Sequence, residues 1–197
     1  MTSSLLVPPR PSSTKAPTRG RSLSPDDATA LRTGQVLVAA HSEGLTGGQV
    51  SAQLYMPMAA PDLWEHLSDY PRWSEYFPNI ACSRELVPTA SGVPRVYQVG
   101  QKSLMGIPTA GDLYLQVHES PHEQIQFRLE RGIFSSFEAT LRFQPWRVGV
   151  LLTYTIQVTL AVPLPWFILR QGIQDDLPHN LRHMRDVICG TGAVISA

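Results

Sequence analysis

The sequence has few of the residues that would point to a metal site, a disulfide framework or a charged partner. Only two of its 197 residues are cysteine, and Cys82 and Cys189 lie far apart with no CxxC or Cys/His cluster. This spacing argues against structural zinc and fits a reducing compartment, although a single disulfide remains open. Sixteen basic and sixteen acidic residues give a formal net charge of zero. Overall charge therefore favours neither nucleic acid nor an anionic membrane, and we expect partners to be selected by shape and apolar contact.

Long apolar runs are also absent. The longest, Leu160 to Leu169, contains Pro163 and Pro165 and is too short to cross a bilayer. Leu5-Leu6-Val7 is too short for the apolar region of a secretory signal, and prolines follow it at once. These absences predict a soluble, cytoplasmic protein.

Residues 1–47 differ in composition from the remainder, because they are rich in Pro, Ser, Thr and Gly and poor in large apolar side chains. Such a segment buries too little apolar area to offset the entropy of ordering it, so we expect a flexible N-terminal tail. Its basic, Ser-rich composition also matches an organelle transit peptide. A third reading is that the amphipathic patch Ala28 to Val38 forms a short helix that docks on the domain. The domain itself is predicted to span residues 48–190, followed by a short tail, 191–197.

A strand followed by two short helices opens this domain. Apolar and polar residues alternate from Val50 to Met56, as in a strand with one buried face. Pro61 suits the first turn of a helix that would bury Trp64. Asp69 is a candidate N-cap for a second helix, which starts near residue 71 and carries Trp73.

Further strands and a long helix complete the pattern. Alternation recurs over residues 113–117, 125–129, 137–143 and 148–162, with turn-length gaps that indicate an antiparallel sheet. A helix is predicted from Pro165 to Cys189, ended by Gly190, with one apolar stripe formed by Trp166, Ile173, Leu177, Leu181, Met184 and Ile188. A helix this one-sided needs a surface to cover, and the concave face of the sheet provides one.

This order of elements resembles the START-like or SRPBCC superfamily, and in particular its polyketide cyclase/dehydrase and coenzyme Q-binding branch. The resemblance covers about residues 48 to 190 and is carried by Trp64 with Leu67, the Asp69-Tyr70-Pro71 turn, Trp73, Pro78 and the helix end from Asn180 to Arg185. It implies an α+β helix-grip fold, in which a curved antiparallel sheet, two short helices and a long C-terminal helix enclose a cavity. These motifs are specific for the fold and uninformative about the ligand.

Seven residues are candidates for binding a ligand in such a cavity. Tyr154 is in phase with the inward residue Leu152, and Tyr97 with Val99, so each hydroxyl could orient a ligand or bond to backbone in the core. Arg170 falls within the apolar stripe by phase, so it should meet a carboxylate, a carbonyl or a polar ligand group, unless it reaches solvent past the start of the helix. The apolar candidates are Leu152, Val158, Ile173 and Leu177.

Other residues that suggest chemistry have simpler interpretations. His179 and His183 have a spacing that can share a metal, with Asp186 nearby, but by phase all three lie on the solvent face. Asp175 and Asp176 are likewise interpreted as a charged outer surface. The sequence shows no Ser/His/Asp arrangement, phosphate loop or inward carboxylate pair, so we expect no catalytic residue, no metal and no cofactor.

The apolar turn before the last helix suggests one more contact. Ile168 lies opposite the apolar stripe by phase, with Phe167 at its edge. These side chains could make a weak, transient membrane contact through which an apolar ligand enters, or they could pack against the N-terminal tail or a second subunit.

The function expected from the sequence is binding or carrying of a hydrophobic small molecule, such as a lipid, a quinone or a polyketide-like aromatic. The first alternative is a polyketide cyclase or dehydratase, which would need an acid or base in the cavity. The second is a protein-interaction module whose interior is filled by side chains. A Tyr/Arg/carboxylate cluster in the cavity would favour the enzyme, and an apolar cavity without converging titratable groups would favour the carrier.

Overall fold

An eight-stranded antiparallel sheet dominates the structure. The computed structural model describes residues 23–43, 46–100, 103–104, 107–108, 111–160 and 166–190. The sheet has the order β1-β2-β10-β9-β8-β7-β4-β3, so the early strand β2 pairs with the last strand, β10. Its strands are β1 Leu37–Glu43, β2 Gly47–Met56, β3 Ile80–Leu86, β4 Arg95–Gly100, β7 Gly111–Ser120, β8 Gln124–Gly132, β9 Phe134–Trp146 and β10 Gly149–Leu160, and a separate two-stranded pair is formed by β5 Ser103–Leu104 and β6 Ile107–Pro108.

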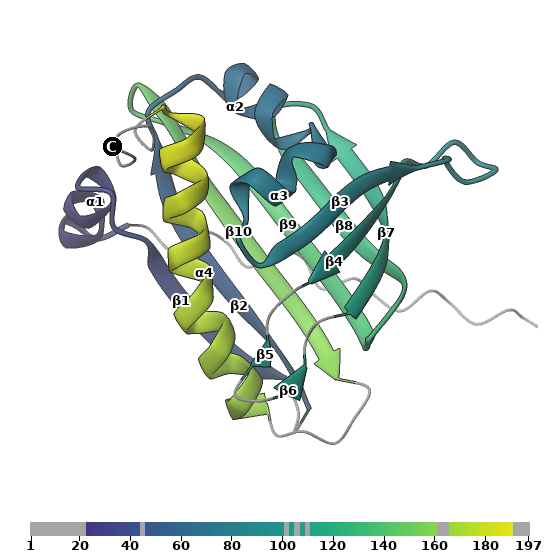
Figure 1. Ribbon diagram of the computed structural model, residues 1–197. Helices are drawn as coiled ribbons and strands as arrows, with labels where there is room; N and C mark the ends of the chain where they lie inside the picture. The colour runs from purple at the N-terminus through teal and green to yellow at the C-terminus, as the bar shows by residue number, and fades with distance from the viewer. Residues whose placement is uncertain are drawn as a thin grey trace, which may run out of the picture.

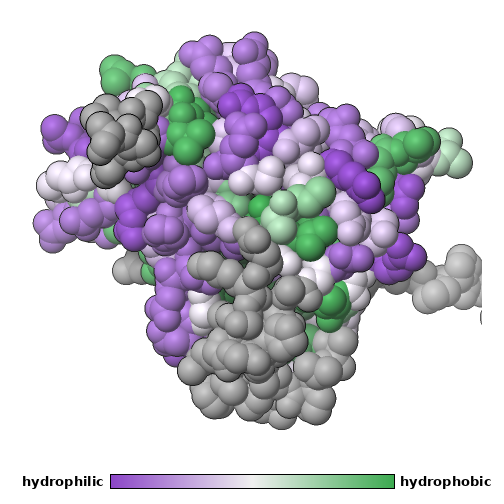
Figure 2. Space-filling model, viewed as in Figure 1, coloured by the Kyte–Doolittle hydropathy of each residue, from purple (hydrophilic) through white to green (hydrophobic). Residues whose placement is uncertain are grey.

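Helix α4, Trp166–Ile188, covers one face of this sheet. Figure 1 shows it crossing in front of β1 and β2, while the short helices close one end of the sheet. Three residues of its predicted apolar stripe are buried, with Leu177 at 4% exposure and Leu181 and Met184 fully enclosed, while Ile173 and Ile188 are partly buried. The side chain of Trp166 lies outside the described set. The opposite side of α4 is largely hydrophilic in Figure 2. The predicted α+β helix-grip architecture is thereby confirmed.

The two short helices form as the sequence predicts, with one difference in detail. Helix α2, Ala60–Leu67, has a proline in its first turn and buries Leu63, Trp64 and Leu67. The second helix begins as a 3₁₀ turn, η1 Tyr70–Arg72, and continues as α3, Trp73–Tyr76. Asp69 occupies the N-cap position as predicted, but its side chain makes no capping hydrogen bond. Pro71 in this turn fixes a helical φ without side-chain help.

The core lies between the sheet and these helices. The inward residues of β2 are all fully enclosed, as are Leu141 on β9 and Ile125 on β8. Each of these side chains except the small Ala52 contributes about 1.5–3 kcal/mol through burial. The other face of the sheet carries polar pairs, including Ser51 with Thr155 and Arg128 with Glu138. This is the alternation that the sequence predicted for a sheet with one wet face.

The prediction of a flexible tail up to residue 47 is wrong for residues 25–43. Helix α1, Pro25–Arg32, is closed by a capping box in which Ser24 and Asp27 exchange hydrogen bonds, and it buries Leu31 completely. Strand β1 pairs with β2 from Leu37 opposite Gln53 to Glu43 opposite Gly47. Backbone pairing at a sheet edge needs few large apolar residues, which is why the composition of this segment was misleading.

At Gly34 the N-terminal segment packs closely against the last helix, α4. Its φ of +82° ends α1 in the left-handed region that favours glycine. A Cβ at this position would lie 2.3 Å from a guanidinium nitrogen of Arg185 in α4. The α1–β1 segment therefore packs against the same helix that covers the sheet. The alternative prediction of a docked helix over residues 28–38 holds in part, because the helix spans Pro25–Arg32 and residues 37 and 38 belong to β1.

Candidate functional site

A cavity of about 190 Å³ lies between the inward face of the sheet and α4. Its apolar walls come from both halves of the sheet and from the helix. The apolar lining residues are Ile80, Leu113, Ile133, Phe134, Phe137, Ile156, Val158, Ile173 and Leu177. Three glycines, Gly100, Gly111 and Gly172, also line it. At Gly111 the absence of a side chain lets Ile133 pack directly against the backbone, where a Cβ would clash with it.

The sheet is divided beside this cavity. Strands β8 and β9 pair only from Gln124 opposite Arg142 to Arg128 opposite Glu138. Beyond this point β8 continues along β7 as far as Gly132, and β9 continues along β10. We call residues 129–137, where the two strands diverge, the β8–β9 fork. Three cavity-lining residues, Ile133, Phe134 and Phe137, belong to the fork, and the rings of Phe134 and Phe137 stack with their centroids 5.7 Å apart.

Tyr154 on β10 contributes a hydroxyl to the cavity lining. It is 9% exposed and its ring packs against Phe77. Burial raises the pKa of this hydroxyl well above its usual range, so it stays protonated at neutral pH. A protonated phenol can both donate and accept a hydrogen bond.

Three amide side chains also line the cavity. Asn79 follows α3, Gln98 lies on β4 and Asn180 lies on α4. Gln98 is largely buried and donates a hydrogen bond from Nε2 to the Ser83 hydroxyl over 3.3 Å. The Oδ1 atoms of Asn79 and Asn180 are buried, and no protein group within the described residues donates to either. Buried polar atoms are normally satisfied, so these two oxygens are exceptions that need an explanation.

Asp176 brings a carboxylate to the same lining. The sequence-based interpretation of Asp175 and Asp176 as outer surface therefore holds for Asp175, which is exposed, and is wrong for Asp176. Asp176 lies about 100° around the helix from Leu177, at the border of the apolar stripe. A wider search around the stripe would have found Asp176 and also Asn180, which lies about 60° from Leu177 on the same side as Asp176.

Four of the seven predicted site residues line the cavity: Tyr154, Val158, Ile173 and Leu177. Leu152 is buried in the core at 1% exposure but lies outside the cavity lining. Arg170 is exposed and does not line the cavity. Of the two predicted alternatives, a polar partner in the interior or contact with solvent, the structure shows contact with solvent. Whether the four lining residues contact a ligand stays a prediction.

The predicted inward orientation of Tyr97 is wrong. On β4 the enclosed residues are Val96 and Gln98, which places Tyr97 on the outer face. There its hydroxyl donates a hydrogen bond to Asp112 over 3.0 Å, and the Arg84 guanidinium lies 4.5 Å from its ring centroid. The inward amide of Gln98 made the alternation of this short strand ambiguous.

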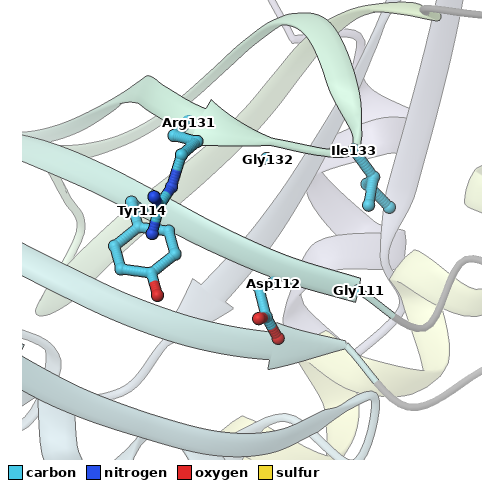
Figure 3. Close-up of a pocket in the computed structure, with 6 residues that line it drawn as sticks. All are labelled: Gly111, Asp112, Tyr114, Arg131, Gly132 and Ile133. Carbon is cyan, nitrogen blue, oxygen red and sulfur yellow. The ribbon is translucent and has the colours of Figure 1, made fainter.

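A second hollow, of about 440 Å³, opens near this outer face at the ends of β7 and β8. Figure 3 shows Arg131 lying over the Tyr114 ring, with Asp112 nearby and Ile133 at the other end. The Arg131 guanidinium is 4.0 Å from the Tyr114 centroid. This hollow is larger than the cavity, but it is more open to solvent and its ionic groups already have partners. The cavity between the sheet and α4 is therefore the better candidate for a small-molecule site.

Other predicted features fall outside the cavity or outside the described part of the chain. His179 is exposed, and Nε2 of His183 lies 3.2 Å from the backbone oxygen of Glu75. Among the described residues, no group of three or more His, Cys, Asp or Glu side chains is placed to hold a metal. The side chains of Phe167 and Ile168 lie outside the described set, so the predicted membrane contact stays untested. Within the described residues no helix is long and apolar enough to cross a bilayer.

Comparison with known proteins identifies the fold and the family. The family model for polyketide cyclase/dehydrase and lipid transport proteins matches residues 56–185, more than half of the chain. A comparison with curated protein sequences finds no match.

Three solved structures illustrate the structural similarity. A START superfamily protein from Mycobacterium smegmatis has a TM-score of 0.63 at 18% identity, covering 73% of this chain and 98% of that one. The Zhui aromatase/cyclase from Streptomyces sp. R1128 has a TM-score of 0.59 at 13% identity, with coverages of 82% and 99%. A STAR-related lipid transfer protein from Xanthomonas axonopodis has a TM-score of 0.52 at 17% identity, with coverages of 75% and 94%. At these identities the similarity shows a shared fold.

Proposed function

Because the chain belongs to the polyketide cyclase/dehydrase and lipid transport family, we propose that it binds a compact hydrophobic small molecule between the sheet and α4. The observation that carries this proposal is the cavity between the sheet and α4, which has predominantly apolar walls and a few polar groups. This combination is typical of small-molecule sites, in which apolar contact supplies affinity and a few polar groups fix orientation.

The size of the cavity narrows the ligand class. Its volume of about 190 Å³ is below the roughly 300–1,000 Å³ of typical drug-sized pockets. This favours a one- or two-ring aromatic, or the ring of a quinone, over a long-chain lipid or a multi-ring polyketide. A ligand that buries about 250 Å² of apolar surface would gain roughly 6 kcal/mol at about 25 cal/mol per Å². That gain corresponds to a dissociation constant of tens of micromolar at best.

Titration calorimetry with 1-methylnaphthalene tests the proposal. We expect the wild type to bind this probe and Ile173→Trp, which fills the cavity from α4, to lose binding at least tenfold, a change of about 1.4 kcal/mol. Ile188→Trp is the matched control, because Ile188 is a half-buried isoleucine on the same helix that does not line the cavity. Equal binding by both folded variants, or no binding by the wild type, would refute the proposed site.

A second candidate function is the cyclase or dehydratase alternative, and one observation favours it. The Asp176 carboxylate and the Tyr154 hydroxyl line the same cavity. Ring closure with loss of water needs a base to remove a proton from carbon and an acid to protonate the departing hydroxyl. Asp176 would be the base, and Tyr154, whose hydroxyl is protonated, would be the acid.

Catalysis can be tested separately from binding. Purified protein would be incubated with a linear polyketone thioester, and mass spectrometry would follow the loss of one water per molecule. Catalysis predicts that Asp176→Asn abolishes the product while 1-methylnaphthalene still binds. Product formation equal to that of a protein-free control would leave binding as the function.

A further inference from the structure

Four side chains form a continuous row across the outer face of the sheet. Arg84 on β3 lies opposite Tyr97 on β4. Tyr97 lies opposite Tyr114 on β7, which in turn lies opposite Arg131 on β8. The two tyrosine rings have their centroids 5.0 Å apart, and a guanidinium lies 4.5 Å from the first ring and 4.0 Å from the second. We call these four residues the arginine–tyrosine row.

The two arginines of the row lack the carboxylate partner that a neighbouring arginine has. Arg95 donates two hydrogen bonds to the Glu130 carboxylate, over 2.7 and 2.6 Å. Arg84 and Arg131 are both exposed, and neither forms an ion pair within the described residues. The row therefore carries two positive charges that no carboxylate of the described chain neutralises by direct contact.

Stacking leaves the hydrogen-bonding edges of both guanidiniums available. A guanidinium stacks on an aromatic ring through its flat face, while its N–H groups point outward from its edge in the geometry that matches a carboxylate. Tyr97 is held in turn by a hydrogen bond from its hydroxyl to Asp112 over 3.0 Å. The rings thus position the arginines before a partner binds, which reduces the entropy lost on binding.

The open hollow on the outer face adjoins one end of the row. Its volume is about 440 Å³, and Tyr114 and Arg131 belong to its lining. Figure 3 shows Ile133 at the other end of the same hollow. Ile133 is 39% exposed, so an apolar surface lies near an arginine that has no carboxylate partner. A partner that presents a carboxylate next to an apolar side chain can contact both.

Other occupants fit this surface less well. A second copy of the chain, docked face to face, would bring the unpaired arginines of one copy against those of the other, and like charges repel. Single-stranded nucleic acid needs free aromatic faces for its bases, but each tyrosine of the row already packs against a guanidinium and the other tyrosine. Anionic membranes are bound by clusters of about four to eight basic residues, more than the row provides.

Arginine and tyrosine are enriched in the contact surfaces of proteins and in their binding hot spots, whereas lysine and glutamate are depleted there. From this composition, the unpaired charges and the adjoining hollow, we propose that the outer face of β3, β4, β7 and β8 docks an acidic protein segment. Its carboxylates pair with Arg84 and Arg131, and an apolar side chain enters the hollow beside Ile133. None of the four row residues lines the cavity, so this proposal does not rest on the proposed binding function.

An NMR titration of the isotope-labelled full chain with an acidic peptide tests the proposal. The probe is the capped peptide Glu-Ser-Ser-Ser-Glu-Ser-Leu. When it is extended, its two glutamates lie on one face about 13 Å apart, close to the roughly 14 Å between the backbones of β3 and β8 at about 4.8 Å per strand. We expect this peptide to shift the amide signals of the row and of Ile133. A control peptide with glutamine in place of both glutamates should not shift them.

Two double variants separate this surface from general charge attraction. Arg84→Gln with Arg131→Gln should weaken binding of the acidic peptide at least tenfold. Arg32→Gln with Arg142→Gln removes the same charge from two other exposed arginines and should change binding less than twofold.

Three results would overturn the proposal. The first is equal weakening by the two double variants, and the second is a wild type whose row signals do not respond to the acidic peptide. The third is a different occupant that binds more tightly and is lost in the row variant. Oligothymidylate, vesicles of phosphatidylcholine with phosphatidylglycerol, and self-association measured by sedimentation test for nucleic acid, membrane and a second copy of the chain in turn.

Discussion

The indole nitrogen of Trp73 donates a hydrogen bond to the backbone carbonyl of Leu67 over 3.0 Å. This bond is buried and connects the start of α3 to the last residue of α2. Carbonyls at the end of a helix lack intrahelical donors, so the indole supplies a partner that the helix cannot. It fixes the corner from which the chain continues through Asn79 into β3.

Replacing Trp73 by Phe should lower the free energy of unfolding by about 1–3 kcal/mol, because it leaves the Leu67 carbonyl buried without a donor. Chemical denaturation followed by circular dichroism measures the change. Val148→Ala is the control, since Val148 is 91% exposed and should change stability by less than about 0.5 kcal/mol. A loss for Trp73→Phe no larger than that of the control would mean that the hydrogen bond contributes nothing.

Leu31→Ala tests whether the N-terminal segment is part of the folded domain. Leu31 is fully enclosed, so the substitution should cost about 2–5 kcal/mol. Its neighbour Arg32 is exposed, and Arg32→Ala should be close to neutral. If Leu31→Ala is as neutral as Arg32→Ala in urea unfolding, α1 does not dock on the domain in solution.

Asn180→Leu should raise the free energy of unfolding of the ligand-free protein by about 1–2 kcal/mol. The substitution removes a buried oxygen that has no donor in the described chain and puts an apolar group of similar volume in its place. Thermal unfolding without added ligand measures this. A variant less stable than the wild type would show that the amide forms a stabilising contact.

Stability should fall as the pH rises above about 10, the ordinary pKa of tyrosine. Burial raises the pKa of Tyr154, and burial together with the hydrogen bond to Glu119 raises that of Tyr70. At high pH the unfolded chain therefore loses these protons while the folded chain keeps them, so deprotonation favours unfolding.

Tyr154→Phe should flatten this alkaline dependence while changing stability at pH 7 much less. Urea unfolding at a series of pH values measures the slope, and Tyr55→Phe, at a half-exposed tyrosine, is the comparison. Equal slopes for the wild type and Tyr154→Phe would show that Tyr154 titrates normally.

The sheet and the long helix were predictable because their burial follows simple periods. Strands β2, β7, β8, β9 and β10 each alternate apolar and polar residues, and the stripe on α4 repeats at helical spacing. Phase predicts the direction of a side chain but not its depth. Arg170 has nearly the phase of Leu177, yet two turns nearer the start of the helix it reaches solvent.

The polar part of the site was less predictable, because a polar residue that points into the core gives the same sequence pattern as one that points to solvent. Gln98 points inward with Ser83 as its partner, and this reversed the assignment of Tyr97. Asn180 lies among polar and charged neighbours, and the sequence pattern does not distinguish a buried amide that lines a cavity from an exposed one at the edge of the stripe. Only the packing of α3 against α4 brings it and Asn79 to the same space.

The β8–β9 fork has a mechanical consequence for the site. The sheet consists of two halves, β1-β2-β10-β9 and β8-β7-β4-β3. Backbone pairing joins the two halves only at the five residue pairs from Gln124–Arg142 to Arg128–Glu138. Between the last of these pairs and Ile133, the single residue that connects β8 to β9, no backbone pairing joins the two halves of the sheet. The cavity lies against this unpaired stretch, so the fork residues that line it can shift without breaking a β8–β9 backbone pair.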